Sequence, residues 1–208
     1  MNLIPDKKLI IFGFGGHARS AADVAFASGY QDLLFVDHNA APNEFFLGHP
    51  VLESLEGVDE SWRFAFPASG DGIKRMKQCD TIAQRDLGLV SLISPMASIG
   101  VGSVVAPGCF VGHHSHIGPM ANIGRGCIIN TGAIVEHDCA VGEYSHISVN
   151  STIAGRSELG AFAMLGAGAI MIDNISVASG TVIGAGSVVT SNVEIAGLYV
   201  GVPARMIR

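Results

Sequence analysis

The feature that most constrains this chain is an apolar residue at every sixth position from Ile93 to Ile195. All eighteen members of the series are apolar, and all but three are β-branched. A period of six matches neither the helical turn nor the two-residue alternation of a half-buried strand. It is typical of a parallel β-helix, in which three short strands form one triangular coil. The pattern therefore predicts about six coils in an unbroken register.

Two other positions of the repeat are also regular. The residue after each apolar position is often Gly, and the residue four places after it is mostly small. We expect the glycines to adopt unusual backbone angles and the small residues to fit tight corners. Cys109, Cys127 and Cys139 occupy the small position, so we interpret them as packing thiols. The spacing of the cysteines gives only weak support to a disulfide or a zinc ribbon.

Composition divides the chain near residue 90. Residues 1–90 contain eight Lys/Arg and twelve Asp/Glu, whereas residues 91–208 contain four and six, together with eighteen glycines. The shift predicts two domains, a small α/β domain over 1–90 and the β-helix over 91–208.

Charge and hydropathy limit the possible partners. The net charge of −6 provides no basic surface for nucleic acid or an anionic membrane. The longest apolar stretch, residues 162–172, is too short to span a bilayer. The N-terminal residues lack the apolar region of a secretory signal, so we expect a cytoplasmic protein.

The N-terminal domain opens with a glycine motif after an apolar strand at Leu9–Phe12. Gly13, Gly15 and Ala18 match G-x-G-x-x-G/A, and a helix is predicted over 17–28, ending before a glycine. The backbone N–H groups of such a turn suit a phosphate. The alternative is a tight strand-to-helix turn that binds nothing.

Two further strands are predicted beside this turn. One covers 33–36 and ends at Asp37, where a ribose-binding acid would lie, and another covers 64–66 and leads to Gly70 and Asp71. A dinucleotide-binding domain needs about six strands, for which ninety residues appear too few. We therefore favour a smaller nucleotide over a dinucleotide-dependent oxidoreductase.

Among five histidines in the β-helix region, His137 is the candidate catalytic base. It occupies a corner position outside the prism, between Glu136 and Asp138. A neighbouring carboxylate can raise the basicity of an imidazole and fix its tautomer. We interpret His113, His114 and His116 as ordinary surface histidines without a chemical role.

Motifs along nearly the whole chain resemble one family. They are Gly13–Ala18, Val36–Asp37, Ile93–Pro95, Asn130–Thr131, Glu136–Cys139, Ser145–His146 and Val200–Arg205. The chain resembles bacterial nucleotide-sugar acetyltransferases of the sialic-acid O-acetyltransferase-like family, which includes the N-acetyltransferases of bacillosamine and perosamine biosynthesis. The resemblance implies a left-handed β-helix, a homotrimer, and acetyl-coenzyme A as co-substrate in a groove between subunits.

The resemblance also implies roles for individual residues. His137 would be the general base and Asp138 the acid that hydrogen-bonds it. The nucleotide sugar would contact Gly13, Gly15, Gly16, His17, Asp37, His38, Gly70, Asp71 and Asn130. Acetyl-coenzyme A would contact His146, Gly155, Gly166, Ala167, Gly184 and Ala185. Some relatives have Glu in place of Asp138 and a second acid in place of His38.

These observations predict an acetyl-coenzyme A-dependent N-acetyltransferase without a metal. By resemblance, its substrate is a nucleotide-linked 4-amino-4,6-dideoxy sugar, with UDP as the best guess, used for bacterial surface glycans or glycoproteins. An acetyl thioester is already activated, so direct attack by the amine suffices. The alternatives are a sialic-acid-type O-acetyltransferase, a zinc carbonic anhydrase-like β-helix, and a non-enzymatic scaffold.

Overall fold

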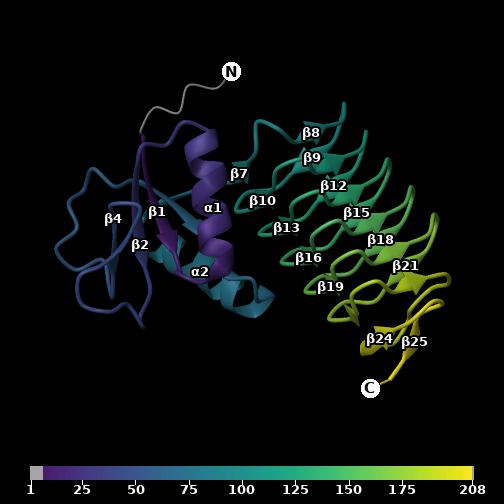
Figure 1. The fold of residues 1–208 in the computed structure, drawn as a ribbon. Coiled ribbons are helices and arrows are strands. Elements are labelled where there is room, and N and C mark those ends of the chain that lie inside the picture. The colour runs from purple at the N-terminus through teal and green to yellow at the C-terminus, as the bar shows by residue number, and fades with distance from the viewer. Residues whose placement is uncertain (1–6, 208) are drawn as a thin grey trace.

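A small sheet with two helices precedes a long stack of two-residue strands in the computed structural model, which describes residues 7–207 (Figure 1). The first six residues, for which we expect no secretory signal, lie outside the described part. Neither helix within 7–207 has the length and hydropathy needed to cross a membrane.

The centre of the N-terminal sheet agrees with the sequence. Strands β1 (Lys8–Phe12), β2 (Asp32–Val36) and β5 (Phe64–Pro67) are parallel, with β1 between the other two. Helix α1 (Gly16–Ala27) follows the glycine turn, and Gly29 has a positive φ just after its C-cap. The three predicted strands and this helix are confirmed to within about one residue.

Four elements of this domain were not predicted. They are β3 (Glu44–Phe46), β4 (His49–Leu52), β6 (Gly88–Leu89) and α2 (Gly72–Gln84). The sheet therefore has six strands, in the order β3-β4-β2-β1-β5-β6. The expectation that ninety residues are too few for six strands is wrong, because the added strands are short and β3 joins β4 as an antiparallel hairpin without a crossover helix.

The C-terminal half is a parallel β-helix with three faces, as the repeat predicts. The first face consists of β7 (Leu92–Ile93), β10 (Phe110–Val111), β13 (Ile128–Ile129), β16 (His146–Ile147), β19 (Met164–Leu165), β22 (Val182–Ile183), β24 (Leu198–Val200) and β25 (Arg205–Met206). The second face consists of β8 (Ser98–Ile99), β11 (His116–Ile117), β14 (Ile134–Val135), β17 (Thr152–Ile153), β20 (Ile170–Met171) and β23 (Val188–Val189). The third face consists of β9 (Val104–Val105), β12 (Asn122–Ile123), β15 (Ala140–Val141), β18 (Glu158–Leu159) and β21 (Ser176–Val177).

The periodic residues fill the prism and stack one coil apart. Ile129, for example, pairs with Ile147, eighteen residues along, and both are fully buried. The series is exposed only at its ends, where no further coil covers Ile93 and Ile99. Cys109, Cys127 and Cys139 are buried in the same core, and each thiol donates to a backbone carbonyl oxygen.

The register slips once, at the C-terminal end, where the sequence predicts no slip. Val177 forms its bridge with Val193 rather than with Ile195, two residues later. Val193 is buried, whereas Ile195 is 66% exposed. The three faces contain eight, six and five strands, because the chain then leaves the repeat and adds β24 and β25 to the first face.

The glycines after the apolar positions have a different role from the one predicted. Positive φ angles occur two residues later, at Gly126 and Asp138 among others. A Cβ at Gly118 would lie 2.5 Å from the backbone nitrogen of His137 in the next coil. These glycines are needed because successive coils approach too closely for any side chain.

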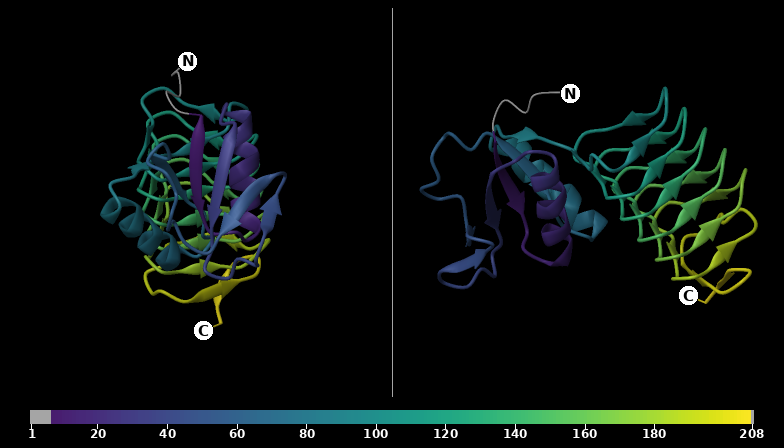
Figure 2. Two further views of the ribbon diagram at one scale, coloured as in Figure 1. Left: turned by 90° about the vertical axis from the view of Figure 1, so that its left-hand side faces the viewer. Right: turned by 45° about the horizontal axis from the view of Figure 1, so that its top comes forward.

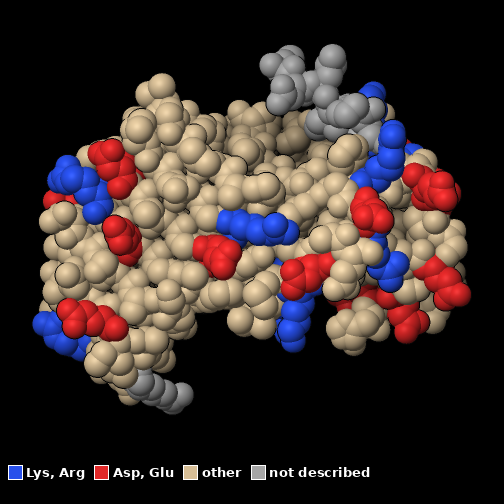
Figure 3. Space-filling model, turned by 180° about the vertical axis from the view of Figure 1, so that it is seen from behind, with Lys and Arg blue, Asp and Glu red and all other residues tan. Residues whose placement is uncertain are grey.

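The two domains share a core. Leu92, Phe110 and Ile128 point outward from the first face and pack with Leu9 and Ala18 of the N-terminal domain. Helix α1 lies between the N-terminal sheet and the β-helix (Figures 1 and 2). Seen from behind, charged side chains gather on the N-terminal domain and are sparse over much of the β-helix (Figure 3).

Candidate functional site

His137 and Asp138 form a side-chain pair at the corner between the second and third faces. Asp138 Oδ2 lies 2.8 Å from His137 Nδ1, and their side chains are 54% and 44% exposed. An ionised carboxylate only accepts hydrogen bonds, so Nδ1 carries the proton and Nε2 keeps a free lone pair. The pair therefore has the tautomer that a general base requires.

The fold itself turns Asp138 toward the histidine. Asp138 has a φ of 58° and follows Val135 by three residues, a position that is left-handed in other coils as well. Asp and Asn tolerate this conformation better than other residues with side chains. The position with left-handed backbone angles, which recurs in other coils, is thus occupied here by a residue with a carboxylate.

Gly155, one coil beyond His137, provides room for the imidazole. A Cβ at Gly155 would lie 2.6 Å from His137 Nε2. We predicted a contact with the coenzyme for this glycine, and its observed neighbour is the catalytic candidate. Any larger residue would displace the His137 ring.

A pocket of about 570 Å³ lies at the glycine turn of the N-terminal domain. Seven of the predicted substrate residues line it, namely Gly13, Gly15, Gly16, His17, Asp37, His38 and Gly70. The lining residues that the sequence reasoning did not single out include Asn39, Glu53, Lys74 and Gln78. Lys74 is the only Lys or Arg in this lining, and it sits in the first turn of α2.

Asp37 braces the glycine turn. Its Oδ2 accepts from the N–H of Phe14 at 2.9 Å, and its Oδ1 accepts from the N–H of Asn39 at 3.0 Å. Burial raises the pKa of Asp37, but the hydrogen bonds from Asn39 and Phe14 outweigh it and hold the pKa below its ordinary value. Asp71, which we predicted to contact substrate, caps α2 by accepting from Lys74 N and does not line the pocket.

His17, His146 and Asn130 meet where the two domains join. The rings of His17 and His146 lie 6.4 Å apart, and His17 packs edge-on against Phe110. Burial, followed by the fields of His146 and Arg75, lowers the pKa of His17 to about 3. Burial and then Arg75 lower the pKa of His146 to about 4, although a hydrogen bond to Gly70 opposes this. Both rings are therefore neutral at physiological pH.

The hydrogen bonds also define the tautomer of His146. Asn130 Oδ1 accepts from Thr131 N, so the Asn130 amide nitrogen faces His146 Nε2, 3.3 Å away. An amide nitrogen only donates, so Nε2 is unprotonated and Nδ1 carries the proton. That proton is available for the backbone carbonyl of Gly70, the hydrogen-bond partner that raises the pKa of His146.

The predicted coenzyme residues do not come together within one chain. Gly166, Ala167, Gly184 and Ala185 follow β19 and β22 at the corner between the first and second faces. His146 lies on the first face beneath the N-terminal domain, and Gly155 lies at the corner of His137. One chain thus carries two separate clusters. The His137 corner consists of His137, Asp138 and Gly155, and the His146 side consists of His17, Asn130 and His146.

Two of the other β-helix histidines, His113 and His116, have structural partners. His113 bridges Ser94 and Asp23, at 2.6 and 3.0 Å, and thereby ties α1 to the β-helix. His116 contacts Ser98 at 2.6 Å in the neighbouring coil. Within residues 7–207, no three His, Cys, Asp or Glu side chains gather as a metal site would require.

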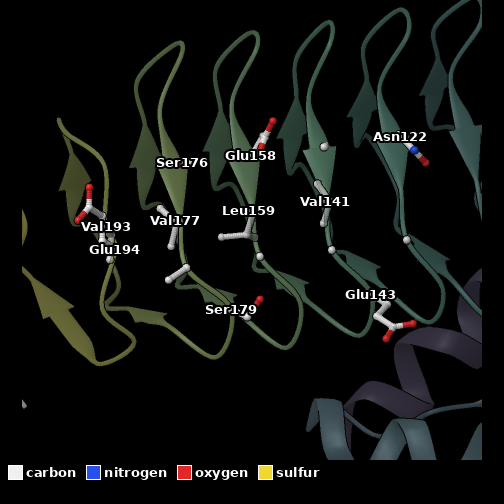
Figure 4. A pocket seen from close by; sticks show the side chains of 15 residues that line it. Asn122, Val141, Glu143, Glu158, Leu159, Ser176, Val177, Ser179, Val193 and Glu194 are labelled. Carbon is white, nitrogen blue, oxygen red and sulfur yellow. The ribbon is translucent and has the colours of Figure 1, made fainter.

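A second groove, of about 600 Å³, follows the third face (Figure 4). Glu143, Glu158 and Glu194 supply its charges, and no Lys or Arg contributes to its lining. Phosphorylated ligands are repelled by such a surface. The smaller pocket at the glycine turn, with Lys74 and free backbone N–H groups, is better suited to a nucleotide.

Comparisons with known proteins agree with this geometry. Residues 8–82 match the family model described as the PglD N-terminal domain. The GDP-perosamine N-acetyltransferase of Caulobacter crescentus, solved as a histidine-to-alanine mutant with coenzyme A and GDP-perosamine, is 30% identical. The match covers 98% of this chain and 97% of that one, with a TM-score of 0.86.

A second relative matches over the same length. The acetyltransferase domain of PglB from Neisseria gonorrhoeae, in complex with acetyl coenzyme A, is 26% identical with a TM-score of 0.90. The match covers 97% of this chain and 100% of that one. WeeI from Acinetobacter baumannii, at 16% identity and a TM-score of 0.72, shares the fold.

Proposed function

Because the chain belongs to the hexapeptide-repeat sugar acetyltransferases, we propose that it transfers acetyl from acetyl-coenzyme A to the amine of a nucleotide-linked 4-amino-4,6-dideoxy sugar. The observation that carries the proposal is the His137–Asp138 pair, whose Nε2 is a free base. The product would be an N-acetylated sugar nucleotide for bacterial surface glycans or glycoproteins.

The proposed reaction is a direct acyl transfer. The amine nitrogen attacks the thioester carbonyl carbon, and His137 Nε2 takes the proton that the nitrogen loses as the C–N bond forms. The C–S bond then breaks, and the thiolate of coenzyme A leaves and takes the proton from the His137 imidazolium, which restores the base. Asp138 holds the imidazole and stabilises its charged form. No covalent enzyme intermediate is needed.

We place the nucleotide in the pocket at the glycine turn. The N-terminus of α1 lacks a side-chain cap, so its first N–H groups are available to a diphosphate, and Lys74 adds a positive charge. UDP stays our prediction for the base. The Caulobacter relative binds a GDP-linked sugar, so both nucleotides belong in the test.

We also propose that the active site forms between subunits of a homotrimer. His137 lies at the corner between the second and third faces and His146 lies on the first face, so a neighbouring chain is needed to join them. The strands of the second face contain no Asp, Glu, Lys or Arg, and they present Ile134, Thr152, Ile170 and Val188 outward. An uncharged face of this kind suits burial between subunits.

An assay of coenzyme A release tests the proposal. The protein is incubated with acetyl-coenzyme A and 4-amino-4,6-dideoxy sugars linked to UDP, GDP or dTDP, with the 4-hydroxy sugars as matched controls. We expect rapid release with one amino sugar and at most slow release with its hydroxyl counterpart. Release with hydroxyl sugars alone would overturn the proposed amine acceptor.

A further inference from the structure

Arg75 of α2 is completely buried at the junction of the two domains. Its five N–H groups meet five backbone carbonyls. Nε donates to Gly126 O at 2.5 Å, Nη1 to Ser69 O and Gly70 O at 2.7 and 3.1 Å, and Nη2 to Tyr144 O and Ser145 O at 2.6 and 3.3 Å. Among the described residues no carboxylate forms an ion pair with it.

The five carbonyls come from both sides of the substrate site. Ser69 and Gly70 line the nucleotide pocket, whereas Gly126, Tyr144 and Ser145 belong to the β-helix. A guanidinium is planar and its donors have a fixed geometry, so it holds both groups in one arrangement. The fit is tight, because a Cβ at Gly72 would lie 2.7 Å from Tyr144 O.

The same loop contacts His146. The carbonyl of Gly70, which accepts from Arg75, also partly opposes the lowering of the His146 pKa. The charge of Arg75 also contributes to the lowered pKa of both His146 and His17. Arg75 therefore acts on this histidine pair through geometry and through charge.

Arg75 also orients the backbone of the loop. In a trans peptide the N–H points opposite to the C=O. With the carbonyls of Ser69 and Gly70 turned toward Arg75, the N–H groups of Gly70 and Asp71 point away from it. Neither N–H donates to another group in residues 7–207. Successive free N–H groups of this kind suit the oxygens of an anion.

We propose that Arg75 is a positioning residue, which holds the Ser69–Gly70 loop of the nucleotide pocket in register with His146 and Asn130 of the β-helix. The inference rests on the proposed function and adds a residue that touches neither substrate. Loss of Arg75 should weaken binding of the nucleotide sugar more than binding of acetyl-coenzyme A, because Arg75 bonds directly to the loop that lines the nucleotide pocket.

Two variants separate the geometry of Arg75 from its charge, and the exposed Arg85 at the end of the same helix provides a matched control. Arg75→Lys keeps the positive charge but loses the planar set of N–H donors of the guanidinium. The KM of the nucleotide sugar should therefore rise about tenfold, while the pH profile of kcat/KM stays unchanged. Arg75→Met should also move the acid limb of kcat/KM to higher pH, because loss of the positive charge raises the pKa values of His17 and His146 while burial still holds them low. Arg85→Met should change neither quantity.

A purely structural Arg75 would give a different result. Both variants would then melt at lower temperature with unchanged KM values and pH profiles, and that outcome would overturn the proposal. If Arg75→Met does not fold, Arg75→Lys still tests the proposal. The quantity to compare is the ratio of the KM of the nucleotide sugar to the KM of acetyl-coenzyme A.

A measurement on the wild-type protein needs no turnover and so is independent of the proposed function. In ¹⁵N spectra, the His146 ring should stay neutral and protonated at Nδ1 from pH 5 to pH 8. Titration of this ring within that range, or protonation at Nε2, would contradict the arrangement. Failure to acetylate any amino sugar would count against the proposed function alone.

Discussion

At the scale of single residues, the most informative position is Asp138, where backbone strain and chemistry coincide. Its left-handed φ is required by the coil, and its carboxylate fixes the proton on His137 Nδ1. Stability and activity should therefore respond differently to substitution at this one position.

Asp138→Asn and Asp138→Gly test that separation. Gly relieves the left-handed strain, so the free energy of unfolding should rise by up to about 1 kcal/mol. Both variants lack the carboxylate, so kcat should fall by about one to two powers of ten. Chemical denaturation and steady-state kinetics measure the two effects. A glycine variant with full activity would show that Asp138 serves only the fold.

The buried histidines predict an acid-labile protein. In the folded state the pKa values of His17 and His146 are about 3 and 4, whereas an unfolded histidine titrates near 6.5. Below pH 6.5 the unfolded state binds more protons, so stability falls as the pH drops toward 4. Each histidine contributes roughly 1.4 kcal/mol per pH unit in that window.

Urea denaturation at pH 7.5, 6.5, 5.5 and 4.5 measures this dependence. His17→Phe should flatten the slope by about half, because it removes one of the two depressed groups. The exposed His38, changed to Phe, is the matched control for the substitution itself. A wild-type protein equally stable at pH 7.5 and 4.5 would disprove the burial of neutral histidines.

The sequence predicts some of these site residues better than others. His137 and Asp138 are adjacent in the chain, so their pairing is visible without a structure. Arg75, Lys74 and Gln78 were missed, because their partners come from distant elements and no local pattern marks them. Helix α2 could have been predicted from the sequence, because Asp71 is a typical N-cap residue before a segment of mixed polar and apolar residues.

At the scale of elements, the six-residue period defines the β-helix almost completely. Its inward residues, corners and strand pairs follow from the period alone, and only the last coil departs from it. The role of the glycines could not be predicted in this way, because the spacing between coils depends on the three-dimensional stack. The short strands β3, β4 and β6 were not predicted either, because a segment of two to four residues is too short to show a hydrophobic periodicity.

Gly160 and Gly168 should differ sharply when changed to Ala. A Cβ at Gly160 would collide with Ser179 N of the next coil, whereas Gly168 has open space and a φ of 65°. We expect Gly168→Ala to cost about 1 kcal/mol of stability, from the left-handed backbone. Gly160→Ala should cost several times as much, from displaced coils. Equal melting temperatures for the two variants would contradict the stacking account.

At the scale of the whole molecule, the two domains pack as one unit, whereas the proposed site is divided between subunits. A shared apolar core and the Arg75 bonds fix the nucleotide pocket against the first face. His137, the proposed general base, lies at a corner of the same prism, away from the first face. A closed ring of identical chains would bring one corner of each subunit to the opposite corner of its neighbour.

Mixing two inactive variants tests this division. His137→Ala removes the base, and Gly15→Asp adds a carboxylate to the nucleotide pocket, where a Cβ meets nothing within 4 Å. If sites form between subunits, random trimers from an equimolar mixture should regain about a quarter of wild-type activity, since an active site must take its base from the Gly15→Asp subunit and its pocket from the His137→Ala subunit. The unmixed variants are the controls. A mixture without activity, despite verified subunit exchange, would place the whole site in one chain.

The central claim is that His137 is the general base of acetyl transfer to an amino sugar. The most direct measurement is the steady-state turnover of His137→Ala with acetyl-coenzyme A and the amino sugar nucleotide that the wild-type protein accepts. The account predicts that kcat falls by about two to four powers of ten while both KM values stay within a few-fold. Turnover close to that of the wild-type protein would contradict it.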